Sequence, residues 1–199
     1  MNKKKYIIFS PINQFGGINL EVGFLAKLIS DYNYVKVISL GNFYKDSSIF
    51  YFDKNLYYNS LNREIYNTSY TIRIITKLLG FFKPNRNPNH FRIDNYITRL
   101  PFICIKKLKL KYIENEILKC DEIVICSQLN SNYTKEIIEI SYRLNKKVFF
   151  RTTGQIKKAH LTKSNINSFN KVTCFIHHSI KNKNLISNFT KKNNHVIID

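Results

Sequence analysis

Short apolar runs alternate with stretches of helical periodicity along most of the chain, which predicts strands and helices in alternation. Each apolar run is closed by polar residues, as expected of a buried strand. The predicted strands are residues 6–9, 35–40, 122–126, 147–151, 173–177 and 196–198. The predicted helices are residues 18–30, 69–82, 131–144 with Ser131 as the N-cap, 179–189, and 91–119 with a break near Pro101.

Two segments are less regular. Residues 41–67 are rich in Tyr and Asn and are interpreted as loop with one short helix, although the apolar residues 49–52 could form a strand. Residues 83–89 hold two prolines and three asparagines and are predicted to be a loop.

Strands separated by helices throughout predict one α/β domain over residues 1–199, doubly wound and Rossmann-like, with a mostly parallel sheet. We find no internal repeat and no long linker. The sequence stops at Asp199 directly after a predicted strand, with no element to cover this strand, so we expect the domain to be cut here.

The composition excludes several classes of protein. A hydrophobic fraction of 44% in 199 residues is too high for a disordered chain. The longest apolar runs are far shorter than the roughly 20 residues of a membrane-spanning helix, and the N-terminus lacks the apolar stretch of a signal peptide. We therefore expect a cytoplasmic protein. Its four cysteines have no CxxC spacing and are expected to be reduced and buried: Cys104, Cys120, Cys126 and Cys174.

The net charge of +19 favours a polyanionic partner. Residues 71–112 hold ten basic side chains and one acid, Asp94, interleaved with bulky apolar residues such as Leu78 and Phe82. This mixture suits the surface of an anionic membrane. An ordinary solvated surface of two packed helices explains it equally well. The candidate membrane-surface residues are Arg73, Lys77, Lys83, Arg86, Lys106, Lys107, Lys109 and Lys111.

Ligands of open parallel sheets bind beyond the carboxyl ends of the strands. After the first strand, Gly16 and Gly17 would let a ligand approach the backbone and the start of a helix, although a tight turn needs glycines as well. After the strand at 147–151, Thr152, Thr153 and Gly154 could hold a polar ligand, although a hydroxyl-capped turn is the simpler interpretation. The pair His177-His178 has no nearby ligand partners, so we predict no metal site.

Four segments resemble the N-terminal half of a GT-B glycosyltransferase, most similar to the family 4 retaining enzymes. The run IIFSP at residues 7–11 with FGGI at 15–18 resembles the first strand and its Gly-Gly loop. Residues 35–40 resemble the next strand. The segment DEIVI at 121–125, followed by KVFFRTTG at 147–154, resembles the part that ends in a Thr-His-Gly turn. Residues 175–179 and 194–199 resemble the last strands before the interdomain crossover.

This resemblance implies an acceptor-binding domain whose nucleotide-sugar donor would be held by a second, C-terminal half that is absent here. It implies that Gly16 and Gly17 approach the donor diphosphate and the acceptor, and that Ser179 matches the serine after the penultimate strand. Thr153 stands where relatives have His, which leaves the catalytic residues unknown. The expected activity is sugar transfer to a lipid-linked or polysaccharide acceptor in bacterial surface-polysaccharide synthesis, at the inner face of the plasma membrane. No other cofactor is expected.

Transfer would require a partner, since the donor-binding half is missing, and a separate donor-binding subunit is one candidate. Two other hypotheses remain open. A pI near 9.8 fits a non-catalytic protein that binds nucleic acid, although no RRM, KH or helix-turn-helix pattern is present. A degenerate remnant of a transferase is the third.

Overall fold

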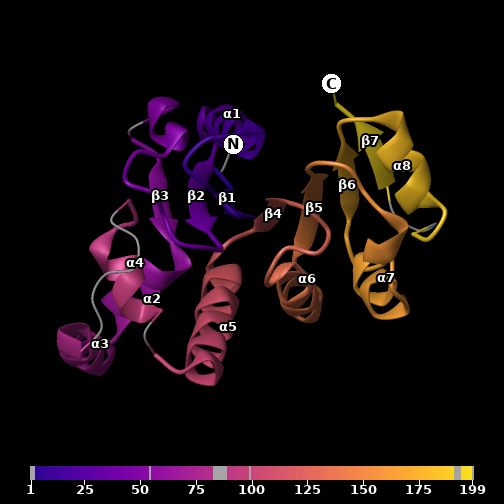
Figure 1. The fold of residues 1–199 in the computed structure, drawn as a ribbon. Coiled ribbons are helices and arrows are strands. Elements are labelled where there is room, and N and C mark those ends of the chain that lie inside the picture. Colours follow the sequence, from indigo (N-terminus) through magenta and orange to yellow (C-terminus); the bar gives the residue numbers. More distant parts are fainter. Residues whose placement is uncertain (1–2, 54, 83–88, 99, 191–193, 199) are drawn as a thin grey trace.

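The structure is a computed structural model that describes residues 3–53, 55–82, 89–98, 100–190 and 194–198. Seven strands form one all-parallel sheet in the order β3-β2-β1-β4-β5-β6-β7 (Figure 1), which confirms the predicted Rossmann-like α/β fold. The strands are β1 (Lys5–Ser10), β2 (Tyr34–Ser39), β3 (Tyr57–Ser60), β4 (Glu122–Ser127), β5 (Lys147–Thr152), β6 (Cys174–His177) and β7 (Asn194–Ile197).

Eight α-helices and two short 3₁₀ helices connect these strands within the described residues. The helices are α1 (Gly17–Ser30), η1 (Ser48–Tyr51), α2 (Leu61–Thr68), α3 (Tyr70–Phe82), α4 (Arg92–Ile97), α5 (Phe102–Lys119), α6 (Thr134–Arg143), η2 (Lys158–His160), α7 (Lys163–Phe169) and α8 (Ile180–Ser187). The long predicted helix over 91–119 is indeed broken at Pro101, which begins α5 as its N-cap.

The two faces of the sheet bury separate clusters of apolar residues. On one face, α1 and η1 pack over β1, β2 and β4, around Ile8, Val37 and Val124. On the other face, α2 and α4–α8 surround a larger core that includes Phe150 and Phe175. Strands buried on both faces are expected to be continuously apolar, which is why β1 and β4 were predictable from their sequences.

The region 41–67 differs from its prediction. Residues 49–52 do not form a strand, because Ser48–Tyr51 is a 3₁₀ helix packed against α1. The third strand is instead Tyr57–Ser60, which pairs with β2 at the edge of the sheet. Its sequence YYNS has no apolar run, so hydrophobic periodicity could not reveal it.

Two smaller predictions are wrong. Helix α6 begins at Thr134, and its N-cap is Tyr133 in the left-handed conformation (φ 66°), so Ser131 does not cap it. The cysteines are free, but they are not all buried: Cys120 and Cys126 are buried, Cys174 is half-buried and Cys104 is exposed. Over the described residues, no helix has the length and apolar character needed to span a membrane.

Candidate functional site

A cleft of about 460 Å³ opens at the carboxyl edge of the sheet, where the chain order reverses between β1 and β4. Strand β1 lies between β2 and β4 in the sheet. The position between β1 and β4 is thus the topological switch point, where ligands of open α/β sheets bind. The cleft is lined by the loop after β1, the loop after β4 and the turn after β5. Its lining residues are Pro11, Asn13, Phe15, Gly16, Gly17, Ile18, Gln128, Ser131, Thr153 and Gly154.

The loop after β1 is held from inside by Asn19, which is fully buried on α1. The Asn19 side chain accepts from the Asn13 N–H at 3.1 Å and donates back to the Asn13 carbonyl at 2.8 Å. It also donates to the hydroxyl of Ser47, which in turn donates to the Asn13 carbonyl. Sequence reasoning missed Asn19 because a lone Asn in a helical pattern carries no signal of its contacts.

The two glycines of the loop differ in what the fold demands of them. Gly16 has φ +135°, a conformation that side chains disfavour, so the backbone itself requires glycine there. Gly17 has no such constraint, and a Cβ placed on it would meet no atom within 4 Å. Packing within the described residues therefore does not require Gly17 to be a glycine, and the open space at this position lies in the cleft.

Helix α1 presents unpaired backbone donors to the same cleft. The N–H groups of Gly17 and Ile18 have no hydrogen-bond partner in the described part of the chain, and the first turn holds no acidic side chain. A helix N-terminus of this kind carries a partial positive charge that attracts anionic groups.

The turn after β5 faces the Gly-Gly loop across the cleft. Gly154 has φ +67°, and Thr153 is 9% exposed with an Oγ1 that has no partner among the described residues. Thr152 differs from the prediction, because its side chain is fully buried and its Oγ1 lies 3.1 Å from Nδ1 of His177. Thr152 thus packs beneath the turn through its contact with His177 and does not line the cleft.

Ser179 also lies outside the cleft lining. It is the N-cap of α8, and its Oγ accepts a hydrogen bond from the Asn182 N–H at 3.2 Å. Asn182 is buried and reaches the turn after β5, where its amide donates to the Gly154 carbonyl at 2.8 Å and accepts from the Ile156 N–H. Ser179 therefore stabilises α8, the helix from which Asn182 holds the turn at the cleft. The sequence did not reveal this role.

An ion pair connects the two walls of the cleft. Glu21, one turn into α1, accepts hydrogen bonds from Arg151 of β5 at 2.8 and 3.2 Å. The same guanidinium donates to the Ile198 carbonyl at 3.1 Å. The pair ties α1, which carries the Gly-Gly loop, to the strand that carries Thr153 and Gly154.

His177 and His195 form a hydrogen-bonded chain near this edge, in which His177 is buried and His195 is half-buried. His177 lies 3.1 Å from Nδ1 of His195, whose Nε2 lies 3.2 Å from the carbonyl and hydroxyl oxygens of Thr190. Burial, with the nearby His195 adding to it, lowers the pKa of His177 to about 4, so this ring is neutral at pH 7. His178 follows the last residue of β6, and its Nδ1 lies 3.2 Å from the Thr152 carbonyl oxygen.

The structure separates the basic residues that the sequence grouped as one membrane surface. Lys106 pairs with Glu136 at 3.3 Å, and Lys107 and Lys111 line a groove between α5 and α6 that also holds glutamates. Arg73 and Lys77 lie instead on α3, and Arg73 donates to the Tyr66 and Asn67 carbonyls. Lys83, Arg86 and the loop at 83–88 lie outside the described residues, as do the side chains of Phe81, Phe102 and Ile103.

Lys109 is not part of any surface, which corrects the prediction. It is 9% exposed and lies 5.5 Å from the centre of the Tyr133 ring. Burial lowers its pKa to about 8, and the nearby Asp94 carboxylate opposes this shift. Asp94 itself is fully buried, accepting from the Ser60 hydroxyl and the Phe43 N–H, and burial raises its pKa to about 6.

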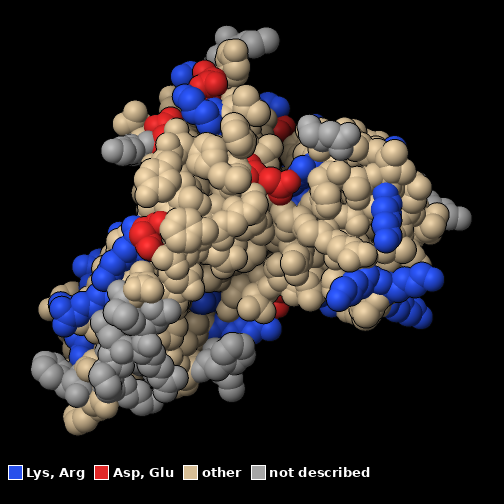
Figure 2. Space-filling model, turned by 45° about the horizontal axis from the view of Figure 1, so that its top comes forward, with Lys and Arg blue, Asp and Glu red and all other residues tan. Residues whose placement is uncertain are grey.

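Helix α3 carries an exposed apolar face. The side chains of this face are between 43% and 84% exposed and recur at helical spacing, while Ile72 and Thr76 face inward. They are Tyr70, Ile74, Ile75, Leu78 and Phe82. Beside them, Lys77 and Arg92 line a hollow of about 380 Å³ between α3 and α4. Figure 2 shows Lys and Arg along the α2–α4 side of the molecule and a second group of them on the side of the C-terminal strands and helices.

Solved structures with this fold define the class of protein that the chain resembles. HepE from Anabaena in complex with UDP matches over 96% of this chain and 43% of its own, with 12% identity and a TM-score of 0.54. TcCGT1 in complex with UDP matches over 100% of this chain and 51% of its own, with 9% identity and a TM-score of 0.55. No model of a known protein family matches the sequence, and neither does any curated protein.

The chain therefore has the fold of one half of a GT-B glycosyltransferase. It spans about half of the length of the structures that it matches. At this identity the likeness establishes the fold and leaves the activity to be argued from the site.

Proposed function

We propose that this chain is the acceptor-binding half of a glycosyltransferase that moves a sugar from a nucleotide-sugar to a lipid-linked or polysaccharide acceptor in bacterial surface-polysaccharide synthesis. The observation that carries the proposal is the cleft at the switch point. Gly17 lines this cleft, and a larger residue would fit at its position without a clash, so the packing of the chain does not explain the glycine. A second α/β half would hold the donor, supplied either by a longer protein or by a separate subunit. The chain alone would bind acceptor without transferring sugar.

The chemistry of the cleft suits an oxygen-rich ligand. The free N–H groups of Gly17 and Ile18 can donate to phosphate or hydroxyl oxygens, and the helix dipole favours negative charge. Thr153 also lines the cleft, and its buried, unpaired hydroxyl could donate to a ligand or accept from it once the side chain rotates. In the complete enzyme, these groups would position the acceptor and stabilise charge on the leaving diphosphate.

A single added methyl group tests this proposal. Gly17→Ala would place its Cβ in open space and leave the fold intact, but it would obstruct a ligand that approaches the backbone. Gly41→Ala is the matched control, because Gly41 also has open space around its Cβ and does not line the cleft. Short-chain polyprenyl-diphosphate sugars are the probes, and calorimetry gives the affinity.

We expect Gly17→Ala to weaken binding of a recognised probe by tenfold or more and Gly41→Ala to leave it unchanged. Equal affinities for both variants and the unmodified chain would show that the acceptor does not approach Gly17. Absence of binding across a panel that varies in sugar and lipid would contradict an acceptor-binding role.

We also propose that α3 docks this half on an anionic membrane, where a lipid-linked acceptor would be found. The exposed apolar face of α3 would enter the headgroup region, and Lys77 and Arg92 would hold a lipid phosphate in the hollow between α3 and α4. This arrangement replaces the broader basic surface expected from sequence, since Lys109 is buried and Lys106 is paired.

Co-sedimentation with liposomes tests the docking. The chain should bind vesicles with 30% phosphatidylglycerol and not vesicles of phosphatidylcholine alone. Leu78→Glu on α3 should reduce binding at least tenfold, whereas Leu28→Glu on α1 should not, although Leu28 is slightly more exposed than Leu78. Tight, salt-sensitive binding of duplex DNA or RNA without liposome binding would favour the nucleic-acid hypothesis instead.

A further inference from the structure

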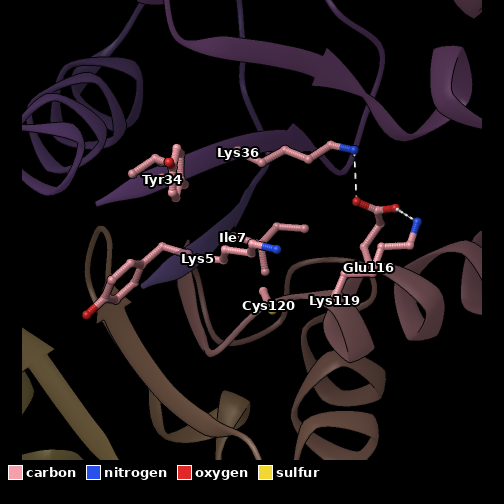
Figure 3. Close-up of a pocket in the computed structure, with 9 residues that line it drawn as sticks. Lys5, Ile7, Tyr34, Lys36, Glu116, Lys119 and Cys120 are labelled. Atoms are coloured by element: carbon pink, nitrogen blue, oxygen red, sulfur yellow. Dashed lines mark hydrogen bonds and ion pairs between the residues drawn. The ribbon is translucent and has the colours of Figure 1, made fainter. Parts of the chain in front are cut away.

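A second pocket, of about 320 Å³, lies at the opposite edge of the sheet from the cleft, at the amino ends of β1 and β2 (Figure 3). Its side walls come from neighbouring positions of the two strands, because Lys5 pairs with Tyr34 and Ile7 pairs with Lys36. The last turn of α5 closes it with Glu116, Lys119 and Cys120. None of these residues belongs to the cleft at the switch point.

The pocket exists because α5 ends before it covers the strands that it packs on. The helix stops at Lys119, and the chain turns through Cys120 and Asp121 into β4, next to β1. The amino ends of β1 and β2 therefore lack a helix over this face. The surface left open is mainly apolar, with the exposed Tyr34 ring at its side and Ile7 and Cys120, which are 2% and 5% exposed, at its base.

Charge at the pocket is predominantly positive. Three lysines line it against one acid, Glu116, which accepts hydrogen bonds from Lys36 at 2.8 Å and from Lys119 at 2.9 Å. Burial works to raise the pKa of Glu116, but these two hydrogen bonds outweigh it and lower that pKa. The one acid of the lining is thus ionised and already neutralised by its lysine partners.

Lys5 is the cation left available. Its ammonium has no hydrogen bond or ion pair among the residues that the structure describes, whereas its backbone N–H donates to the Asp121 carboxylate at 2.8 Å. Lys36, in contrast, is held by Glu116, by the Tyr112 hydroxyl and by the Tyr57 ring, 4.7 Å from its centre. A ligand would therefore meet apolar walls and one unpaired ammonium, with Lys119 beside it.

We propose that this pocket binds a small amphiphilic anion, a molecule with a flat apolar body and a single carboxylate or sulfonate. The body would lie against the Tyr34 ring and over Ile7 and Cys120, and the anionic group would pair with the ammonium of Lys5. The volume equals that of about ten molecules of liquid water and limits the ligand to roughly the size of a two-ring compound. Apolar contact provides affinity, and the ammonium groups select the charge.

The test uses 2-naphthoate as the probe and amide NMR spectra of the full chain as the readout. Titration should shift the signals of residues 5–7, 34–36 and 119–120, at the amino edge, and leave those of residues 16–18 and 153–154 unchanged. The neutral analogue 2-naphthalenemethanol should bind at least tenfold more weakly, because it lacks the charge that Lys5 recognises.

Three variants separate charge at the pocket from charge elsewhere. Lys5→Met should weaken 2-naphthoate binding about tenfold, and Lys5→Arg should restore it by returning the charge. Lys163→Met, which removes an exposed lysine from α7, is the matched control and should have no effect. Lys5 is itself exposed, so the thermal midpoint of each variant should stay near that of the unmodified chain.

The proposal is overturned if millimolar 2-naphthoate shifts no signals at the amino edge, or if it shifts only those of α3. Equal binding of the anionic and neutral naphthalenes, or equal losses in Lys5→Met and Lys163→Met, would refute recognition of the anion by Lys5. None of these outcomes depends on acceptor binding at the switch point, since the two sites share no residue.

Discussion

The ion pair between Glu21 and Arg151 connects the two walls of the cleft, so its loss should lower the stability of the chain. Replacing Glu21 by Gln keeps one hydrogen-bond acceptor and the shape of the side chain, removes the charge, and replaces the second carboxylate oxygen by an NH2 group. The Arg151 guanidinium, which also donates to the Ile198 carbonyl, then remains in place without its counterion. The perturbation is therefore mainly electrostatic.

The magnitude follows from the exposure of the two side chains, which is 11% for Arg151 and 29% for Glu21. Exposed pairs contribute about 0–1 kcal/mol, and breaking a fully buried pair costs about 3–5 kcal/mol. Because this pair is mostly buried and Gln can still accept, we expect a loss of about 2 kcal/mol in the free energy of unfolding. For a chain of this size that loss corresponds to a fall of about 4–8 °C in Tm.

Urea unfolding followed by circular dichroism at pH 7 measures this loss. Glu114→Gln provides the control, since Glu114 and its partner Arg143 are 40% and 63% exposed, and it should cost less than about 0.5 kcal/mol. A double-mutant cycle with Arg151→Met should give a coupling energy of about 1–2 kcal/mol. If Glu21→Gln costs no more than Glu114→Gln, or if the coupling energy is near zero, the pair does not hold the walls together.

Three further predictions concern substitutions of single residues. Gly23→Ala should lower the free energy of unfolding by at least about 1–3 kcal/mol in urea unfolding, because a Cβ on Gly23 would overlap the Phe52 ring; a stability equal to that of the unmodified chain would contradict this packing. Burial raises the pKa of Asp94 to about 6, so the folded state binds more protons than the unfolded state between about pH 4 and 6, and stability falls as the pH rises through that range. Asp94→Asn should abolish this pH dependence, so that the free energy of unfolding of the variant falls by up to about 3 kcal/mol less over that range than that of the unmodified chain. If the two pH–stability curves are parallel, the pKa of Asp94 is not raised. Ser179→Ala should lower the free energy of unfolding by about 1 kcal/mol through loss of the α8 N-cap. It should also shift the NMR amide signals of the turn at 154–156, which Asn182 holds. Unchanged signals there would show that the cap does not support the turn.

Most of the fold could be predicted because its strands are buried on both faces. Residues 6–9 and 122–126 are continuously apolar, which marks central strands of a parallel sheet. Strand β3 lies at the edge and needs no such run, so its sequence YYNS resembled a loop. The apolar residues 49–52 serve a different purpose, since the 3₁₀ helix packs against α1.

The site was predictable only where a backbone signal marks it. Gly16 and Gly154 have positive φ values, and glycines after strands indicated both walls of the cleft. Asn19 and Asn182 act through contacts with distant backbone groups, which one sequence cannot show. Burial of Lys109 was equally hidden, because only the packing of α5 reveals which of its lysines face inward.

The measurement that tests the central claim most directly is an amide NMR titration of the full chain with a short-chain polyprenyl-diphosphate sugar. We expect the largest shifts at residues 16–18, 128 and 153–154, and we expect Gly17→Ala to require at least tenfold more ligand to produce them. If the same acceptor shifts signals elsewhere and leaves those residues unchanged, the cleft at the switch point is not the acceptor site.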